Sequence, residues 1–263
     1  MAKLILCADD FAMRAEVDSA ILQLICAGKL NATACMVLSP RWPQAAKSIQ
    51  REIRQQASIG LHLDFTEFNS SYSLAKLILA CISRRIDQSW VMARIQAQFD
   101  AFEAALGTAP DYIDGHQHIH QLPVIREALV AEMCRRYGKQ LPWLRIAQTP
   151  ASWSFKANII NWLGAGALKR LAQQANIPTT PILLGVYDFD LARDDYRHAF
   201  QHWLQQAAQY PISALMCHPA TNQAVTQDEI ATARYAEYQA LMGMDVAQMA
   251  KQYGVTLART PLS

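Results

Sequence analysis

Four short polar clusters in the sequence bring carboxylate and imidazole side chains together. They cover residues 8–11 (Ala-Asp-Asp-Phe), 60–64 (Gly-Leu-His-Leu-Asp), 114–120 (Asp-Gly-His-Gln-His-Ile-His) and 217–219 (Cys-His-Pro). Carboxylate oxygens and neutral imidazole nitrogens are common ligands of divalent metal ions, and three protein ligands leave one coordination position for water. A structural zinc site more often has four ligands rich in cysteine, and no cysteine pair here has that spacing. The residue types therefore predict a catalytic metal site.

Three of these clusters have a simpler explanation when each is taken alone. A single histidine on a strand, such as His62, is more often a satisfied core residue than a ligand. An acidic pair such as Asp9 and Asp10 commonly caps the helix that follows it, and His218 before a proline can belong to a turn. Four such clusters on separate strands are better explained by function.

The run from 114 to 120 is the hardest to explain by packing. In an extended strand, Asp114, His116, His118 and His120 would share one face, so that one carboxylate and three imidazoles would line one cavity. Some of them must then lie behind the metal ligands. A ligand histidine generally donates its second N–H to a carboxylate, and Asp114 or Asp64 could be that acceptor.

The surrounding sequence predicts alternating strands and helices, and each polar cluster falls where an expected strand ends. We expect strands at 4–7, 33–38, 58–65, 112–116, 143–147, 182–187, 212–217 and 255–258, and helices at 16–27, 43–56, 74–84, 88–106, 123–137, 154–174, 194–208 and 228–252, the last broken near Gly243. The carboxyl ends of parallel strands converge on one face, which would bring the clusters together. Seven or eight βα repeats without a linker predict one α/β domain over residues 1–263, a (β/α) barrel, with an open doubly wound sheet as the alternative.

Composition excludes several classes of protein. With 52% hydrophobic and 17% charged residues, the chain is too apolar to be disordered, and its net charge of +2 gives no basic footprint for nucleic acid. No apolar run approaches the ~20 residues that cross a membrane, and the first apolar run is too short for a signal peptide. Six cysteines without a Cys-x-x-Cys pair indicate reduced thiols packed in a core, so we expect a cytoplasmic protein.

Taken in order, the four clusters resemble the motifs of the YdjC-like carbohydrate deacetylases, which include chitooligosaccharide deacetylases and hopanoid-associated proteins of the ChbG and HpnK type. The matching segments are 8–11, 59–62, 114–120 and 215–220, and the resemblance covers nearly the whole chain. Two positions depart from the family pattern: Ala12 stands where glycine is usual, and Gln117 where some members have histidine. The segment between the second and third motifs is also short compared with chitooligosaccharide enzymes.

The resemblance implies a deformed (β/α) barrel, one divalent metal ion and a carbohydrate substrate, with a homodimer as the suggested assembly. By the same resemblance, Asp10, His62 and His116 would hold the metal, while Asp9 and His218 would be catalytic. Two histidines and one aspartate favour zinc, and completion by waters would admit magnesium.

The implied reaction is hydrolysis of an N-acetyl group on an amino sugar. Asp9 would take a proton from the attacking water, and His218, with a pKa near neutrality, would donate one to the leaving nitrogen. Arg145, at an expected strand end, would orient Asp9, or else be a surface arginine paired with a nearby carboxylate. Two alternatives stay open: a metal-dependent hydrolase of an ester or phosphoester, and a sugar-binding protein without catalysis. Among six tryptophans, Trp143 is the one we expect to stack on a sugar.

Overall fold

The strands of the protein run parallel to one another in a single sheet. The structure is a computed structural model that describes residues 1–68, 71–138, 140–150, 161–222 and 228–261. Its strands are β1 (Ala2–Phe11), β2 (Ala32–Cys35), β3 (Ser58–Leu63), β4 (Tyr112–Gly115), β5 (Trp143–Arg145), β6 (Thr179–Thr180), β7 (Leu183–Leu184), β8 (Ile212–Cys217) and β9 (Val255–Leu257). They lie side by side in the order β6-β5-β4-β3-β2-β1-β8-β7, with β9 beside the first residues of β1.

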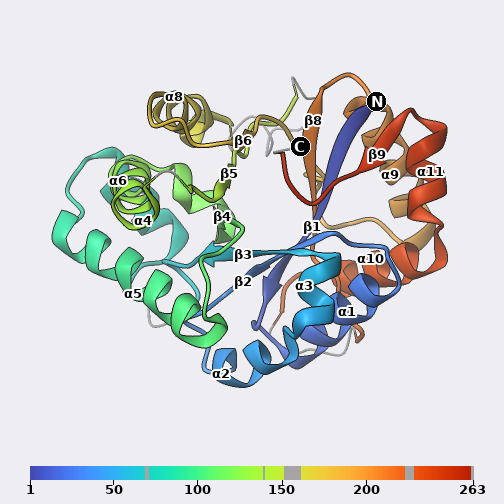
Figure 1. The fold of residues 1–263 in the computed structure, drawn as a ribbon, viewed down its shortest axis with the longest axis horizontal. Helices are drawn as coiled ribbons and strands as arrows, with labels where there is room; N and C mark the ends of the chain where they lie inside the picture. Colours follow the sequence, from blue (N-terminus) through green and yellow to red (C-terminus); the bar gives the residue numbers. More distant parts are fainter. Residues whose placement is uncertain (69–70, 139, 151–160, 223–227, 262–263) are drawn as a thin grey trace.

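Helices surround this sheet on its outer side (Figure 1). They are α1 (Ala15–Cys26), α2 (Trp42–Ala45), α3 (Arg51–Gln56), α4 (Leu74–Ile82), α5 (Gln88–Leu106), α6 (Ile125–Tyr137), α8 (Gly166–Gln174), α9 (Arg193–Ala207), α10 (Ala231–Gly243) and α11 (Val246–Gln252), with short helical turns at Ala46–Ser48, His116–Gln121 and Asn161–Ala165. Most strands are followed by a helix, and this alternation keeps the strands parallel.

The sheet is nearly closed into a barrel through one stretch of chain, residues 178–184. On one side, the amides of Leu144 and Ile146 donate to the carbonyls of Pro178 (2.8 Å) and Thr180 (3.3 Å). On the other side, the amide of Ala214 in β8 donates to the carbonyl of Ile182 at 2.9 Å. The (β/α)-barrel prediction is therefore confirmed.

Side chains along the strands alternate between the helices outside and the interior of the barrel. Leu4 and Leu6 belong to the large apolar cluster that includes the helices, whereas Ile5 and Cys7 belong to a separate interior cluster with Tyr112 and Trp143. The rings of Tyr112 and Trp143 stack with centroids 4.2 Å apart. Trp143 is only 2% exposed, so the prediction that it stacks on a sugar is wrong.

Gly60 leaves room for this ring pair. A Cβ atom at Gly60 would lie 2.5 Å from the ring of Tyr112, closer than a real contact allows. The glycine in the second motif thus lets an aromatic pair fill the barrel interior next to the polar residues at the strand ends.

Several expected elements differ in extent. The helix expected at 43–56 is split into α2, a short turn and α3, because Ile49 (ψ 68°) and Gln50 (ψ 176°) leave the helical region. The strand expected at 182–187 is only β7, and β6 was not expected. In the helix expected at 154–174, residues 154–160 lie outside the described part of the chain. Cys26 and Cys134 are exposed, so the expectation that all six thiols are packed in the core is wrong for these two.

None of the described helices is long and apolar enough to cross a membrane.

Candidate active site

The end of β1 turns two consecutive carboxylates toward the same space. Strict alternation would place Asp9 and Asp10 on opposite faces of the strand. The pairing of β1 with β2 shifts register between Ala8 and Phe11, and Asp10 has a φ of 68°. This bulge redirects the Asp10 side chain, and both carboxylates are almost fully buried.

His62 and Asp114 face each other across β3 and β4. They are register partners in the parallel pair, and His62 Nδ1 lies 2.6 Å from Asp114 Oδ1. A carboxylate accepting the Nδ1–H holds the imidazole with Nε2 free to accept a proton or a metal ion. Asp114 is therefore the acceptor behind His62, one of the two that the sequence left open.

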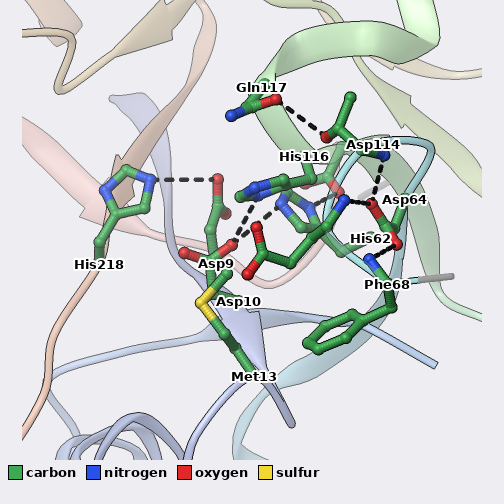
Figure 2. A network of polar contacts seen from close by, with 12 residues as sticks. Asp9, Asp10, Met13, His62, Asp64, Phe68, Asp114, His116, Gln117 and His218 are labelled. Carbon is green, nitrogen blue, oxygen red and sulfur yellow. Dashed lines mark hydrogen bonds and ion pairs between the residues drawn. The ribbon is translucent and has the colours of Figure 1, made fainter. Parts of the chain in front are cut away.

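Three side chains converge on one point that could hold a metal ion (Figure 2). Asp10 Oδ1 lies 3.4 Å from His62 Nε2 and 3.1 Å from His116 Nδ1, and the ligand atoms of all three lie within 4.8 Å of one another. Two ligands of a tetrahedral zinc ion at ~2.1 Å are separated by roughly 3.4 Å. The donor types and their separations therefore fit a divalent cation.

The carboxylates around this point favour a positive charge there. Burial opposes ionisation of Asp10, but Arg234 and His116 beside it hold the pKa of its carboxyl well below the usual range. Burial also lowers the pKa of His62, yet the carboxylates of Asp114, Asp10 and Asp9 together raise it to about 10. A cation among these carboxylates would replace the proton on His62.

Asp9 is held by an arginine that reaches it from β5. Arg145 Nη1 donates to Asp9 Oδ1 at 2.8 Å and Nη2 donates to Oδ2 at 2.6 Å, while Nη2 also lies 2.7 Å from Asp114 Oδ2. Arg145 is 1% exposed, so it is not a surface arginine. This two-point contact fixes the plane of the Asp9 carboxylate.

His218 stands on the other side of Asp9, directly after β8. Its Nε2 lies 3.9 Å from Asp9 Oδ2, and its ring meets the ring of Phe189 edge-on with centroids 5.2 Å apart. Burial lowers the pKa of His218 to about 4, against the opposing charges of Asp10 and Asp9. The near-neutral pKa expected from the sequence is therefore wrong, and the imidazole is neutral at pH 7 in the resting protein.

The remaining histidines of the third motif do not line a shared strand face. The strand ends at Gly115, and residues 116–121 form a tight turn in which Gln117 and His118 have φ of 53° and 59°. His120 is fully buried with Nε2 2.9 Å from the carbonyl oxygen of Arg145, so it contacts the backbone of β5 instead of the metal-ligand group. His118 Nδ1 is buried without a hydrogen-bond partner among the described residues.

Asp64 has a different role from the one predicted. Its Oδ1 accepts from the amides of Thr66 (2.8 Å) and Glu67 (2.7 Å), and its Oδ2 accepts from the amide of Phe68 (2.8 Å). These bonds order the loop after β3, as Figure 2 shows. Asp64 thus shapes a loop beside the site, and the proposal that it orients a ligand histidine is wrong.

Two charged residues of α10 reach the site without having been expected there. Arg234 Nη2 donates to Asp10 Oδ2 at 2.7 Å, and Glu237 Oε2 accepts from the amide of His218 at 2.5 Å. One feature of the sequence could have identified them. They are two opposite charges three residues apart, on the same side of a helix as the small apolar residues Ala233, Ala236 and Ala240.

The chain is similar in sequence to proteins named carbohydrate deacetylase. It is 27% identical to the one from Homo sapiens over 153 residues, which are 52% of this chain and 46% of that protein, and 26% identical to the one from Mus musculus over 57% of this chain and 51% of that protein. The matched region spans about half the length of these relatives.

Solved structures share the fold. A protein from Enterococcus faecalis, described provisionally as a cellobiose-phosphate cleavage protein, has a TM-score of 0.74 at 22% identity and covers 98% of this chain and 97% of its own. The catalytic domain of a peptidoglycan N-acetylglucosamine deacetylase from Eubacterium rectale has a TM-score of 0.50 at 8% identity, covering 100% of this chain and 89% of its own. The family model described as YdjC-like protein matches residues 3–252, and the chain belongs to that family.

Proposed function

We propose that this protein is a metal-dependent hydrolase that removes the N-acetyl group from an amino sugar. The observation that carries the proposal is the position of Asp9 and His218, 3.9 Å apart and beside the converging donors of Asp10, His62 and His116. An acceptor and a donor of protons next to a cation are what amide hydrolysis needs. The curated relatives named carbohydrate deacetylase support a sugar as the substrate.

Asp10, His62 and His116 would hold the metal ion. A divalent cation there would polarise the amide carbonyl and make a nearby water more acidic. Two imidazoles and one carboxylate favour zinc over magnesium. Arg234 occupies Asp10 Oδ2, so only Oδ1 faces the two histidines.

Asp9 would remove the proton from the attacking water. Arg145 holds both oxygens of Asp9, which keeps the carboxylate oriented toward the water whose proton it would accept. Because His218 is neutral at rest, the proton gained by Asp9 can pass to its Nε2 and from there to the leaving nitrogen. The amine then departs protonated, and acetate and the free amino sugar are released.

A phosphoester substrate fits the site less well. Two arginines of the site, Arg145 and Arg234, are already bonded to Asp9 and Asp10. Neither guanidinium is therefore free to help a metal ion neutralise the charge of a phosphate.

Acetate release from a panel of N-acetylated sugars tests the proposal. The panel runs from diacetylchitobiose to N-acetylglucosaminyl lipids, with the protein as purified, after chelation, and after adding back zinc or magnesium. We expect release from at least one sugar, its loss on chelation and its recovery with zinc. A protein that binds one metal ion per chain yet releases no acetate from any sugar would contradict the proposal.

A further inference from the structure

The loop after β8 is attached to α10 through three backbone groups, two of His218 and one of Ala220. Glu237 accepts the amide of His218 at 2.5 Å, Arg234 Nη1 donates to the carbonyl of His218 at 3.4 Å, and the carbonyl of Arg234 accepts the amide of Ala220 at 3.1 Å. Both backbone groups of His218 thus bond to side chains one helical turn apart on α10.

The imidazole of His218 depends on this backbone attachment for its direction. Asp114 holds the ring of His62 through Nδ1, whereas Nδ1 of His218 is buried without a hydrogen-bond partner in the described chain. The ring of Phe189 limits rotation from one side. With no carboxylate orienting the ring, a shift of the His218 backbone would carry Nε2 away from Asp9.

The two α10 side chains are ionisable groups in a place where burial disfavours charge. Arg234 is 3% exposed and Glu237 is fully buried. A buried charge is weak evidence for stability, since apolar residues of similar volume are often as stable or more so. Here both side chains have specific partners: Arg234 bonds Asp10 and Asp228, and Glu237 accepts a hydrogen bond from the hydroxyl of Tyr187 at 2.6 Å. This arrangement is therefore better explained by function than by stability.

We propose that Arg234 and Glu237 are positioning residues, which fix His218 relative to Asp10 by holding the His218 backbone and the Asp10 carboxylate from one helix. The inference rests on the proposed deacetylation, in which His218 protonates the leaving nitrogen. Neither residue touches the reacting atoms; each acts through His218 or Asp10.

The dependence of rate on the leaving group separates this role from a purely structural one. An alkyl amine must be protonated to leave, whereas the p-nitrophenolate of p-nitrophenyl acetate leaves without a proton. Glu237→Ala and Arg234→Lys should lower kcat on the N-acetyl sugar by about 10- to 100-fold, with KM little changed. For Glu237→Ala, kcat on p-nitrophenyl acetate should stay within about threefold of the wild-type value, because Glu237 contacts neither a proposed metal ligand nor Asp9. Glu237→Gln keeps one acceptor oxygen and should recover part of the loss.

Matched controls exist in a second charge cluster, which surrounds the buried carboxylate of Glu132. Glu132 on α6 is 1% exposed and pairs with Arg135 and Arg136, and Arg136 also pairs with Asp100 and Glu103 on α5. Glu132→Gln and Arg136→Lys should leave the ratio of the two rates unchanged. An equal fall of both rates in Glu237→Ala would overturn the inference.

A nuclear magnetic resonance measurement tests the backbone contact without relying on turnover. Labelling with ¹⁵N-histidine gives signals from only seven backbone amides, and the His218 signal is the one lost in His218→Gln. A short bond to a carboxylate moves an amide proton downfield, so this signal should move upfield in Glu237→Ala and stay in place in Glu132→Gln. An unmoved signal would overturn the inference, whereas a wild-type protein inactive on all sugars would contradict only the proposed function.

Discussion

Arg145 and Asp9 form a buried two-point ion pair between β5 and β1, with N···O distances of 2.8 and 2.6 Å. The same guanidinium lies 2.7 Å from Asp114 Oδ2, and Asp114 in turn holds His62. One arginine thus links the residue proposed as the base to the carboxylate that orients a proposed metal ligand. Its fork geometry matters as much as its charge.

Replacing Arg145 by lysine keeps the charge and removes the fork. We expect Arg145→Lys to lower kcat for acetate release by about 10- to 100-fold, because an ammonium cannot hold both Asp9 oxygens in one plane. Metal content per chain should stay at the wild-type level. Full activity of Arg145→Lys would show that orientation of Asp9 does not limit the rate, and Arg136→Lys is the matched control.

Asp114 and Asp64 should differ in their effect on metal affinity. Asp114→Asn weakens the contact to His62 Nδ1, and loss of such a partner typically costs 10- to 100-fold in metal affinity. Asp64→Asn changes contacts to the loop after β3 and to Arg94 on α5, and should leave the affinity within about twofold. Competition with a chromophoric chelator measures both, and equal losses in the two variants would contradict the assignment of Asp114.

Glu237 should make stability depend on pH near neutrality. Burial raises the pKa of Glu237 to about 7 from 4.5, against the hydrogen bonds from Tyr187 and the His218 amide. Between these two pKa values the folded protein binds up to one more proton than the unfolded chain. The contribution of Glu237 to the free energy of unfolding therefore falls as pH rises, by up to about 3 kcal/mol. Urea unfolding at about pH 5 and 7.5 should show this fall in wild type relative to Glu237→Gln.

Glu132 is the control for this prediction, because its pKa is shifted in the opposite direction from that of Glu237. Hydrogen bonds from Arg135, together with those from Arg136, lower the pKa of Glu132 to about 2, so its stabilisation is lost only as pH falls below 4.5. Glu132→Gln should therefore keep a constant difference from wild type between about pH 5 and 7.5. A constant difference for Glu237→Gln as well would show that Glu237 does not titrate in this range.

Ala12 occupies a backbone conformation that favours glycine. Its φ is 75°, and an L-residue in this region costs about 1–2 kcal/mol. In Ala12→Gly, relief of that strain should offset the ~0.8 kcal/mol of a lost buried methyl group and the 0.5–1 kcal/mol of added chain entropy. Thermal unfolding should place the variant within about 0.5 kcal/mol of wild type.

A glycine substitution in a helix is the comparison for Ala12. Ala20 is fully buried within α1. Glycine relieves no backbone strain there and costs about 1 kcal/mol of helix stability, and loss of the buried methyl group lowers the stability further. Ala20→Gly should therefore be clearly less stable than Ala12→Gly. Similar losses in the two variants would show that Ala12 is not strained.

Strand ends were predictable because the polar residues follow short apolar runs at regular intervals. His62, Asp114 and Arg145 each lie in the last two residues of a strand, and His218 follows one directly. The turn at 116–121 was not predictable from the same pattern. Alternating histidines are compatible with an extended strand, and the left-handed conformations of Gln117 and His118 arise from the tertiary structure around them.

The contribution of α10 could not be derived from local sequence. Arg234 lies more than 200 residues from its partner Asp10, and Glu237 lies 19 residues from its partner His218. Charged residues on a helix are normally exposed to solvent. Only the alanines on the same side of the helix indicate that this face is buried. Which buried partner each charge meets depends on how β1, β8 and α10 pack together.

The most direct test of the proposed chemistry compares wild type with Asp9→Asn for metal content and acetate release from the same N-acetylated sugar. The substitution keeps the size of the side chain next to Arg145 and removes the group proposed to accept the proton from water. We predict one metal ion per chain in both proteins, with acetate release by wild type and a loss of at least about 10²-fold in Asp9→Asn. Full acetate release by metal-loaded Asp9→Asn would contradict the account.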